Sequence, residues 1–485
     1  MEDVGGQILS FRTIPNSPRH VSVDAVKVLF VQLGKAARVL LSSFDQEPFF
    51  GFSCLTQVSP VLAAPVLIIK LASREKVTVF ACLNVLCDFC DLSWLSNKTL
   101  KRKVQCPGMR SKVGIYNLHM RAMGGGEKLT LVLAEHLSLA HNVFLFSAEP
   151  LDVPALEQFF DVDLSRVKVV CLKTPGPLSR VRAKLSGNTG LPVSLHHEHQ
   201  LRLHELDLFI NNSYGSGLMC PTTRGIFMCM FPHPASPVVN NVVNSYSMIV
   251  AISRYAADWV WKRWDRHSEV LYPPCDDMGR PSAKEKIILH VGRFIADSVE
   301  DERHYKGQNV LLDTFKQMTD LHQQGWELHF TGSLSTDRKS KTFADTLMRA
   351  AEGLPVFFHF NSTRNELREL YRRAAIYWHA TGYGFDADKY PSKQEHFGIS
   401  TVEAMSAGAV PVVYATGGQR EIVTDEVDGY WWTDIDRLVN QTRRLANDPV
   451  LCSELAQQAV LSSKRFSKET FVANIERLFG QDLHD

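Results

Sequence analysis

The stretch that decides the fold is Gln394–Glu421, QEHFGISTVEAMSAGAVPVVYATGGQRE. Its order of residue types predicts a loop, a helix, a buried strand and a second loop. Thr401–Ala407 places two apolar side chains on one helix face, and Gly408 can end that helix in the left-handed conformation. Val410–Val413 is a short apolar run, which is typical of a strand inside a parallel sheet. The stretch therefore predicts one unit of an α/β fold.

Two carboxylates and a glycine pair in this stretch are candidates for ligand binding. Glu395 precedes the predicted helix and Glu403 lies within it. This spacing lets one carboxylate point at a ligand over the helix N-terminus while the other reaches along the helix. Gly417 and Gly418 allow close backbone approach, and we expect them to offer N–H groups to an anion.

Composition bounds the class of protein. The chain has 485 residues, enough for two or three domains, and its hydrophobic content of 45% is ordinary for a globular protein. A net charge of +1 argues against nucleic acid as the main partner. Ten cysteines are too sparse for a disulfide scaffold, and Cys87 and Cys90 form one CxxC without a second pair, so we expect no zinc site and a reducing compartment.

The first 110 residues resemble no known domain. Their first 25 residues lack the apolar core of a secretory signal. Pro48–Ile69 is uncharged and long enough to span a bilayer, but it contains Pro60, Pro65 and several polar residues. Two interpretations stay open: a true span, and a membrane-associated or hydrophobic packing segment.

A run of alternating strands and helices begins at Lys112. The strand VGIYNL is followed by Gly124–Gly126 and a predicted helix, Lys128–Leu139. Strand, glycine loop and helix let backbone amides meet a phosphate or sugar, although the loop lacks the G-x-G-x-x-G of a dinucleotide site. The alternative is a tight turn with no ligand. The further predicted elements are Asn142–Ser147, Val153–Phe160, Val167–Leu172, Asp207–Asn211, Gly225–Phe231 and Ser247–Ala251.

His233 follows the apolar strand Gly225–Phe231. A histidine at the carboxyl end of a parallel strand points toward the crevice where such sheets bind ligands. It would orient an acceptor hydroxyl or sense pH there, whereas a purely structural role in its proline-rich turn is the alternative. Leu271–Cys275 has two prolines, which predict a stiff interdomain linker.

A second alternating run opens with the strand Lys286–Val291, followed by Arg293. Lys306 and a glycine then precede the predicted helix Asn309–Leu321. Two cations beside a helix N-terminus suit a diphosphate, which arginine can bind in a fork. The alternative is that both are surface residues without a role. Trp326–Gly332, Val356–Phe360, Glu366–Ala375 and Ala375–Ala380 continue the alternation.

The run EHFGIS-x-VEAM-x-AG-x3-VV-x3-GG, which contains Glu395 and Glu403 as an E-x7-E pair, resembles family 4 of the retaining glycosyltransferases (glycosyl transferases group 1). The resemblance extends from about Lys112 to Val460. It implies the α/β fold called GT-B, with two Rossmann-like domains facing across a cleft and here an N-terminal extension. The expected domains are residues 1–110 (extension of unknown role), 111–275 (acceptor domain), 283–460 (nucleotide-sugar donor domain) and 461–485 (C-terminal helix).

The resemblance also implies roles for the candidate residues. Arg293 and Lys306 would hold the donor's diphosphate, Glu395 a hydroxyl of the transferred sugar, and Glu403 the ribose; His233 completes the catalytic candidates. The donor-binding candidates are Gly125, Gly126, His396, Phe397, Gly398, Ile399, Ser400, Glu403, Gly417 and Gly418. No metal ligand and no cofactor is expected, because no Asp-x-Asp pair sits where the diphosphate should be.

The expected activity is transfer of a hexose, with retention, from a nucleotide-diphosphate sugar to a hydroxyl of a glycan or lipid-linked acceptor. EHFGI and Tyr272–Asp276 resemble GDP-mannose-using mannosyltransferases of lipid-linked oligosaccharide synthesis, so GDP-mannose is placed ahead of the UDP-sugars. We expect the cytoplasmic side, in soluble or membrane-associated form, with peripheral membrane contact and no nucleic acid. The alternative is an inactive sugar-nucleotide-binding or scaffold protein of the same fold.

Overall fold

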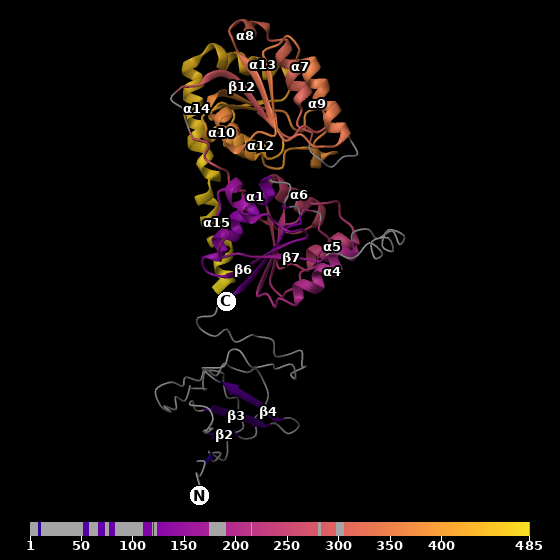
Figure 1. Ribbon diagram of the computed structural model, residues 1–485, viewed down its shortest axis with the longest axis vertical. Helices are drawn as coiled ribbons and strands as arrows, with labels where there is room; N and C mark the ends of the chain where they lie inside the picture. The colour runs from indigo at the N-terminus through magenta and orange to yellow at the C-terminus, as the bar shows by residue number, and fades with distance from the viewer. Residues whose placement is uncertain are drawn as a thin grey trace. The chain divides into compact units, whose positions relative to one another are not determined.

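The computed structural model divides the chain into two compact units, residues 1–105 and 106–485 (Figure 1). It describes residues 110–484 apart from 119, 121–123, 174–190, 215, 280–282 and 297–304, together with four strands before residue 110. These four strands form an antiparallel sheet in the order β1-β2-β3-β4. Their bounds are β1 Ile8–Ser10, β2 Phe52–Gln57, β3 Val66–Ala72 and β4 Val77–Cys82.

Part of Pro48–Ile69 lies in the four-stranded sheet. The stretch contains β2 and the first half of β3, and its other residues lie outside the described ones, as do Cys87 and Cys90. In the part of the chain that the structure describes, no helix has the length and apolar character needed to cross a membrane.

The second unit begins with a seven-stranded, fully parallel sheet in the order β11-β10-β9-β8-β5-β6-β7. Helices α1 and α15 cover one face and α4 and α5 the other (Figure 1), which is why the strands are continuous apolar runs. The strands are β5 Lys112–Tyr116, β6 Asn142–Ser147, β7 Lys168–Cys171, β8 Leu208–Asn211, β9 Gly225–Cys229, β10 Met248–Ala251 and β11 Glu269–Val270. The helices are α1 Gly125–Ser138, α2 Val153–Phe160, α4 Leu191–Arg202, α5 Pro237–Asn244 and α6 Arg254–Trp264.

A six-stranded parallel sheet follows, in the order β14-β13-β12-β15-β16-β17. Helices α7 and α13 contribute to the core on one face, and α10 and α11 to the core on the other. The strands are β12 Glu285–Val291, β13 Glu327–Gly332, β14 Val356–Phe360, β15 Ala374–His379, β16 Val410–Tyr414 and β17 Tyr430–Trp432. The helices are α7 Gln308–Lys316, α8 Thr319–Gln323, α9 Arg338–Ala350, α10 Arg364–Arg373, α11 Ile399–Ser406, α12 Gln419–Ile422 and α13 Ile435–Asn447.

The end of the chain returns to the first sheet. Helix α14, Pro449–Ser463, belongs to the second sheet's domain, and α15, Lys468–His484, lies beside α1 (Figure 1). Lys468 on α15 pairs with Glu135 on α1 at 2.7 Å. The boundary expected at residue 461 falls inside α14, because the crossing occurs one short turn later, at Lys464–Phe466.

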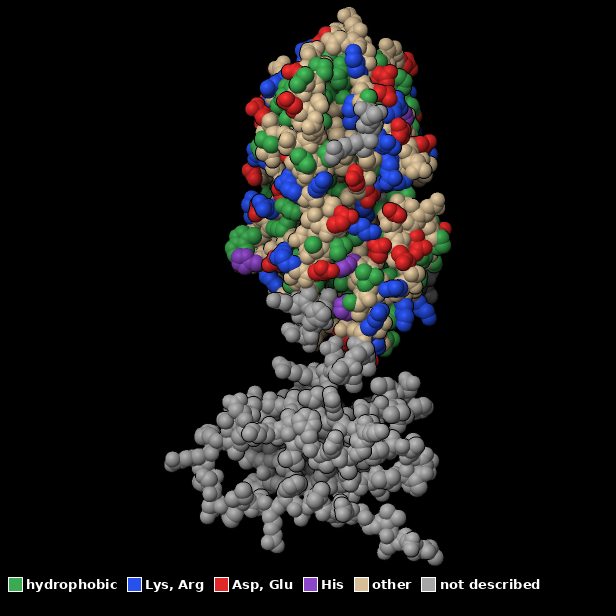
Figure 2. Space-filling view, turned by 90° about the vertical axis from the view of Figure 1, so that its left-hand side faces the viewer, with side chains coloured by type: hydrophobic (Ala, Val, Ile, Leu, Met, Phe, Trp, Pro, Cys, Tyr) green, Lys and Arg blue, Asp and Glu red, His purple; other side chains and the backbone are tan. Residues whose placement is uncertain are grey.

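The hydrophobic core continues through the contact between the two sheet domains. One cluster joins Leu129 and Ile252 of the first domain with Phe397, Val402 and Met405 of the second, all of them buried. The two domains are therefore packed together. On the face shown in Figure 2, Lys and Arg side chains are interspersed with Asp and Glu side chains.

One predicted helix is wrong in its extent. The stretch Asn309–Leu321 forms two helices, α7 and α8, instead of one. The break comes at Met318, whose side chain is fully buried and whose backbone leaves the helical conformation at φ −96°, ψ 50°. Tertiary packing of this methionine therefore overrides the local helical periodicity.

Buried neutral histidines should make the fold sensitive to acid. His290 on β12 is 1% exposed, its Nδ1 lies 2.9 Å from the Trp378 carbonyl oxygen, and burial lowers its pKa to about 3. Between pH 6.5 and 3 the unfolded chain binds a proton here that the folded chain does not, so stability falls as the pH falls through this window. We expect His290 to cost about 2 kcal/mol of unfolding free energy at about pH 5 relative to about pH 8.

Urea unfolding at a series of pH values measures this loss. The variant His290→Asn keeps an N–H donor and cannot be charged, so its stability should fall less steeply than that of the parent as the solution is acidified. Equal slopes in parent and variant would show that His290 does not contribute to acid sensitivity.

Candidate active site

Glu395 lies in a loop that runs from the 3-10 turn Pro391–Lys393 to the start of α11. Its Oε2 accepts a hydrogen bond from Lys306 Nζ at 2.6 Å and lies 3.5 Å from His379 Nε2. Lys306 stands just before Gly307, the N-cap of α7, and His379 ends β15. Three separate elements of the second domain thus bring a carboxylate, an ammonium and an imidazole together.

His379 and Lys306 contribute differently to this cluster. His379 is buried, and desolvation lowers its pKa, so the imidazole stays neutral at physiological pH. Lys306 is the charged partner of Glu395, and the two side chains are 16% and 15% exposed. The pair is therefore accessible from the cavity and available to a ligand.

The cluster opens on a cavity of about 270 Å³ between the two sheet domains. Two helix N-termini meet there, because Gly125 and Gly126 begin α1 and Ile399 and Ser400 begin α11. Among the described residues, the lining is Gly125, Gly126, Leu129, Met230, Ile252, Pro273, Arg293, Lys306, Glu395, His396, Phe397, Gly398, Ile399 and Ser400. The structure therefore brings ten of the predicted site residues to one cavity.

The electrostatics of this cavity favour an anion. The first N–H groups of a helix have no acceptor within the helix and carry its positive dipole end, and two helices contribute them here. Arg293 is exposed, and within the described residues no carboxylate pairs with it. Among the described residues of the lining Glu395 is the one carboxylate, and it already balances Lys306. The surplus positive charge suits a group with two or more negative charges.

Gly398 sets the direction of α11 and cannot be replaced without strain. It is the N-cap of α11 at φ +120°, and a Cβ there would stand 2.0 Å from Gln419 Nε2. Gln419 cannot simply move away, because its Oε1 accepts from Thr401 Oγ1 at 2.9 Å. The close approach and the positive φ together require glycine.

We expect Gly398→Ala to destabilise the fold more than a matched glycine variant. Gly353→Ala at φ +78° meets no atom within 4 Å, so it should cost only the left-handed strain of roughly 1–2 kcal/mol. Gly398→Ala should lose a further 1–3 kcal/mol, roughly, from overpacking. Chemical denaturation of both variants measures the difference, and equal losses would contradict the steric argument.

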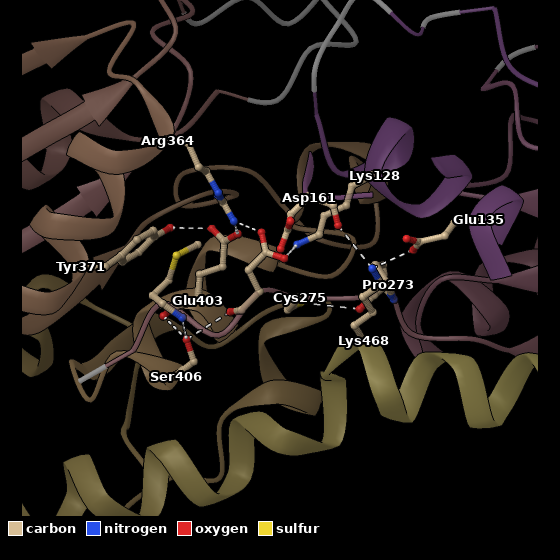
Figure 3. A network of polar contacts seen from close by, with 12 residues as sticks. Lys128, Glu135, Asp161, Pro273, Cys275, Arg364, Tyr371, Glu403, Ser406 and Lys468 are labelled. Carbon is tan, nitrogen blue, oxygen red and sulfur yellow. Dashed lines mark hydrogen bonds and ion pairs between the residues drawn. The ribbon is translucent and has the colours of Figure 1, made fainter. Parts of the chain in front are cut away.

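Glu403, expected to bind the ribose, does not line the cavity but lies one turn along α11 (Figure 3). It is 6% exposed, and both of its oxygens have partners. Arg364 donates to Oε1 from both terminal nitrogens at 3.3 Å, and the Tyr371 hydroxyl donates to Oε2 at 3.1 Å. Burial raises the pKa of Tyr371, so its hydroxyl stays protonated and can donate this hydrogen bond.

Comparison with known proteins finds a family model that the second domain resembles. Residues 279–461 match the family model described as glycosyl transferases group 1. Because of this match, we call the second domain the group 1 domain. It contains β12–β17 and every second-domain residue in the described part of the cavity lining.

The curated relatives that this chain matches are distant. The chain is 25% identical over 236 residues to the GDP-Man:Man(3)GlcNAc(2)-PP-Dol alpha-1,2-mannosyltransferase of Xenopus laevis, covering 44% of each chain. It is 23% identical over 267 residues to the Dictyostelium discoideum protein of the same name, covering 51% of this chain and 50% of that one. The matches thus span about half the length of these relatives.

Solved structures share the fold across both domains. HepE of Anabaena, solved in complex with UDP and glucose, has a TM-score of 0.57 at 18% identity, covering 76% of this chain and 99% of HepE. Sucrose-phosphate synthase of Thermosynechococcus elongatus has a TM-score of 0.58 at 17% identity, covering 77% of this chain and 99% of the synthase. The GT-B fold expected from the sequence is confirmed.

Three further predicted site residues lie away from the cavity lining. The prediction that Gly418 offers its N–H to an anion is wrong, because that N–H donates to the Glu395 carbonyl at 2.8 Å. A Cβ on Gly417 would stand 2.2 Å from the same carbonyl oxygen, so both glycines pack directly against the backbone of the Glu395 loop. His233 is absent from the lining; its carbonyl accepts from Trp264 Nε1 at 3.0 Å, and its ring lies 5.0 Å from that of Tyr214.

His396 and Phe397 of the group 1 domain also hold the two domains together. The His396 ring stacks on Phe231 with centroids 4.1 Å apart, and the His396 carbonyl accepts from Ser253 Oγ at 2.6 Å. Phe397 is 2% exposed in the shared core. Both residues line the cavity, so the wall of the site is also the domain contact.

Sequence reasoning missed Glu421, which joins the domains beside the site. Its carboxylate accepts from the backbone N–H groups of Arg254 and Tyr255 at 2.8 and 2.7 Å, and from the Tyr272 hydroxyl at 2.9 Å. A carboxylate of the group 1 domain thus caps α6 of the first domain. The partners of Glu421 are 149 to 167 residues away, so no local spacing could have indicated it.

Proposed function

We propose that the chain is a glycosyltransferase that moves a hexose from a nucleotide-diphosphate sugar to a hydroxyl of a glycan or lipid-linked acceptor. The observation that carries the proposal is the cavity where two helix N-termini, Arg293 and Lys306 surround Glu395. The group 1 domain that forms most of its wall supports the same interpretation.

In this reaction the bond between the anomeric carbon and the donor phosphate breaks, and its electron pair leaves with the nucleoside diphosphate. The acceptor oxygen forms the new bond to the anomeric carbon, and its proton goes to the departing phosphate. Negative charge grows on that phosphate, where Arg293, Lys306 and the first amides of α11 would stabilise it. Glu395 would hold a sugar hydroxyl near the anomeric carbon, where its charge also offsets positive character on the ring.

The donor and the stereochemistry are part of the proposal. We place GDP-mannose first, since relatives named as GDP-mannose-dependent mannosyltransferases match this chain, and UDP-sugars second, since HepE was solved with UDP and glucose. A lipid-linked acceptor is proposed on the same relatives. We propose retention, with attack on the leaving-group face, and in this proposal Glu395, paired with Lys306, orients the sugar. Two cations at the diphosphate would serve where other enzymes use a metal.

Donor binding by the purified protein tests the proposal. Calorimetry and nucleotide release would be measured with GDP-mannose, UDP-glucose, UDP-galactose and UDP-N-acetylglucosamine, each with and without a chelator. We expect one donor to bind saturably with chelator present, and Arg293→Ala and Glu403→Ala to weaken binding about 10- to 100-fold. Arg349→Ala, an exposed arginine on α9, is the matched control.

Two outcomes would contradict the proposal. If no donor binds, or if Arg293→Ala binds as tightly as the Arg349→Ala control, the cavity is not a donor site. If binding requires metal, the metal-independent part fails and the transferase part stands.

A further inference from the structure

Asp276, on the segment between the two sheet domains, is the shared partner of two cations. Its Oδ1 pairs with Lys128 Nζ on α1, and its Oδ2 pairs with Arg364 Nη2 at the start of α10. Arg364 in turn contacts Glu403 (Figure 3). One carboxylate thus links a helix of the first domain to a helix of the second.

This network lies next to the cavity on all three of its elements. Lys128 follows the cavity residue Gly125 by three positions on α1, and Glu403 follows Ser400 by three on α11. Residues three apart on a helix share a face. Asp276 likewise stands three residues after Pro273, which also lines the cavity. A ligand that extends beyond the cavity along α11 would meet Glu403 and Arg364.

The segment around Asp276 is held firmly against α11. Ser406 Oγ lies 3.2 Å from the Asp276 carbonyl oxygen and 2.7 Å from the Glu403 carbonyl oxygen, and it accepts from the Met278 N–H at 3.0 Å. Figure 3 shows Ser406 on the far side of Glu403 from Arg364. The Asp276 side chain therefore has a defined position from which to orient Arg364.

We propose that Asp276 is a positioning residue for nucleotide binding: it holds Arg364 beside Glu403, so that donor affinity depends on a side chain that does not itself touch the nucleotide. This inference rests on the proposed function, in which Glu403 receives the ribose. Arg364 keeps the Glu403 carboxylate oriented, and Asp276 keeps Arg364 from turning toward solvent. Lys128 ties the arrangement to α1 of the first domain.

Lys128 complicates the simplest test. Its side chain is buried, and burial lowers its pKa to about 8. Asp276→Asn removes the anion that it pairs with and leaves a buried ammonium, which destabilises the fold whatever the role of Asp276. Lys128→Met combined with Asp276→Asn removes both charges together and should restore stability.

The test measures GDP or UDP affinity by calorimetry, donor KM and kcat, and urea stability for four variants beside the parent. We expect Asp276→Asn to weaken nucleotide affinity about tenfold and to raise KM with little change in kcat. Lys128→Met/Asp276→Asn should recover stability and remain weak in nucleotide binding. Arg364→Ala should weaken binding similarly, and Asp276→Asn/Arg364→Ala no further, because the two residues act as one unit.

Asp320→Asn is the matched control. Asp320 on α8 accepts two hydrogen bonds from Arg443 on α13, and this variant breaks that ion pair away from the cavity. The inference would be overturned if Asp276→Asn and this control bound the nucleotide with equal affinity. It would also be overturned if Asp276→Asn lowered kcat and left KM unchanged. Recovery of both stability and affinity in the Lys128→Met double variant would assign Asp276 a structural role only. If the parent binds no nucleoside diphosphate, the proposed function fails and this inference with it.

Discussion

We expect Lys306→Met to lower the rate of the proposed sugar transfer about 10²- to 10³-fold, because it removes one charged group aimed at the leaving group. Lys306 Nζ is the ammonium of the cavity, 2.6 Å from Glu395, and it is held by the turn at Gly307. Methionine keeps the length and the apolar stem but has no charge. The departing diphosphate would then lose one of its two cationic side chains, and Glu395 would lose its partner.

Steady-state kinetics with the donor found by the binding panel measure this effect. Lys316→Met is the matched control, because Lys316 is paired with Asp313 at 3.0 Å on the surface of α7. Its rate should stay within about twofold of the parent, since Lys316 does not line the cavity and its surface pair affects only stability, by at most about 1 kcal/mol. A rate for Lys306→Met equal to that of Lys316→Met would remove Lys306 from the mechanism.

Glu395→Gln is expected to separate catalysis from nucleotide binding. Transfer should fall about 10²-fold, because the carboxylate charge near the anomeric carbon is lost. Affinity for the nucleoside diphosphate alone should become tighter, since Lys306 no longer shares its charge with a carboxylate and one negative charge leaves the cavity. If Glu395 were needed only for folding, Glu395→Gln would lower both the transfer rate and the affinity for the nucleoside diphosphate.

Calorimetry with GDP and UDP, beside donor turnover, distinguishes these outcomes. Glu369→Gln on α10 is the control, because its carboxylate is exposed and lies 3.9 Å from Arg372 in a loose surface pair. Weaker nucleotide binding by Glu395→Gln would show that the carboxylate serves the diphosphate side of the site. Unchanged turnover would exclude Glu395 from the reaction.

The parts of the fold that follow from local pattern were predictable. The strands Asn142–Ser147 and Val356–Phe360 were expected at their observed bounds, as was the helix Val153–Phe160. Apolar runs flanked by turn residues carry this information, because burial on both faces of a parallel sheet requires them. The same reasoning missed α4 and α9, which were not expected, and joined α7 to α8.

The sequence by itself determined two groups of cavity residues. The first is the contiguous stretch Glu395 to Ser400. The second is a pair of cations: Arg293, which follows a strand, and Lys306, which precedes a helix. The physical reason is local: the carboxyl ends of parallel strands and the N-termini of the next helices lie at one edge of the sheet, so residues at those joints converge.

Only the tertiary structure decided the partners of these residues. Glu421 caps a helix 167 residues earlier in the chain, and Asp276 binds one cation from each domain. Gly418, interpreted from its local sequence as an anion donor, gives its N–H to the Glu395 loop instead. Such contacts depend on how the two sheets pack against each other, and that packing is set by a shared core whose members are far apart in sequence. No spacing of residues along the sequence indicates this packing.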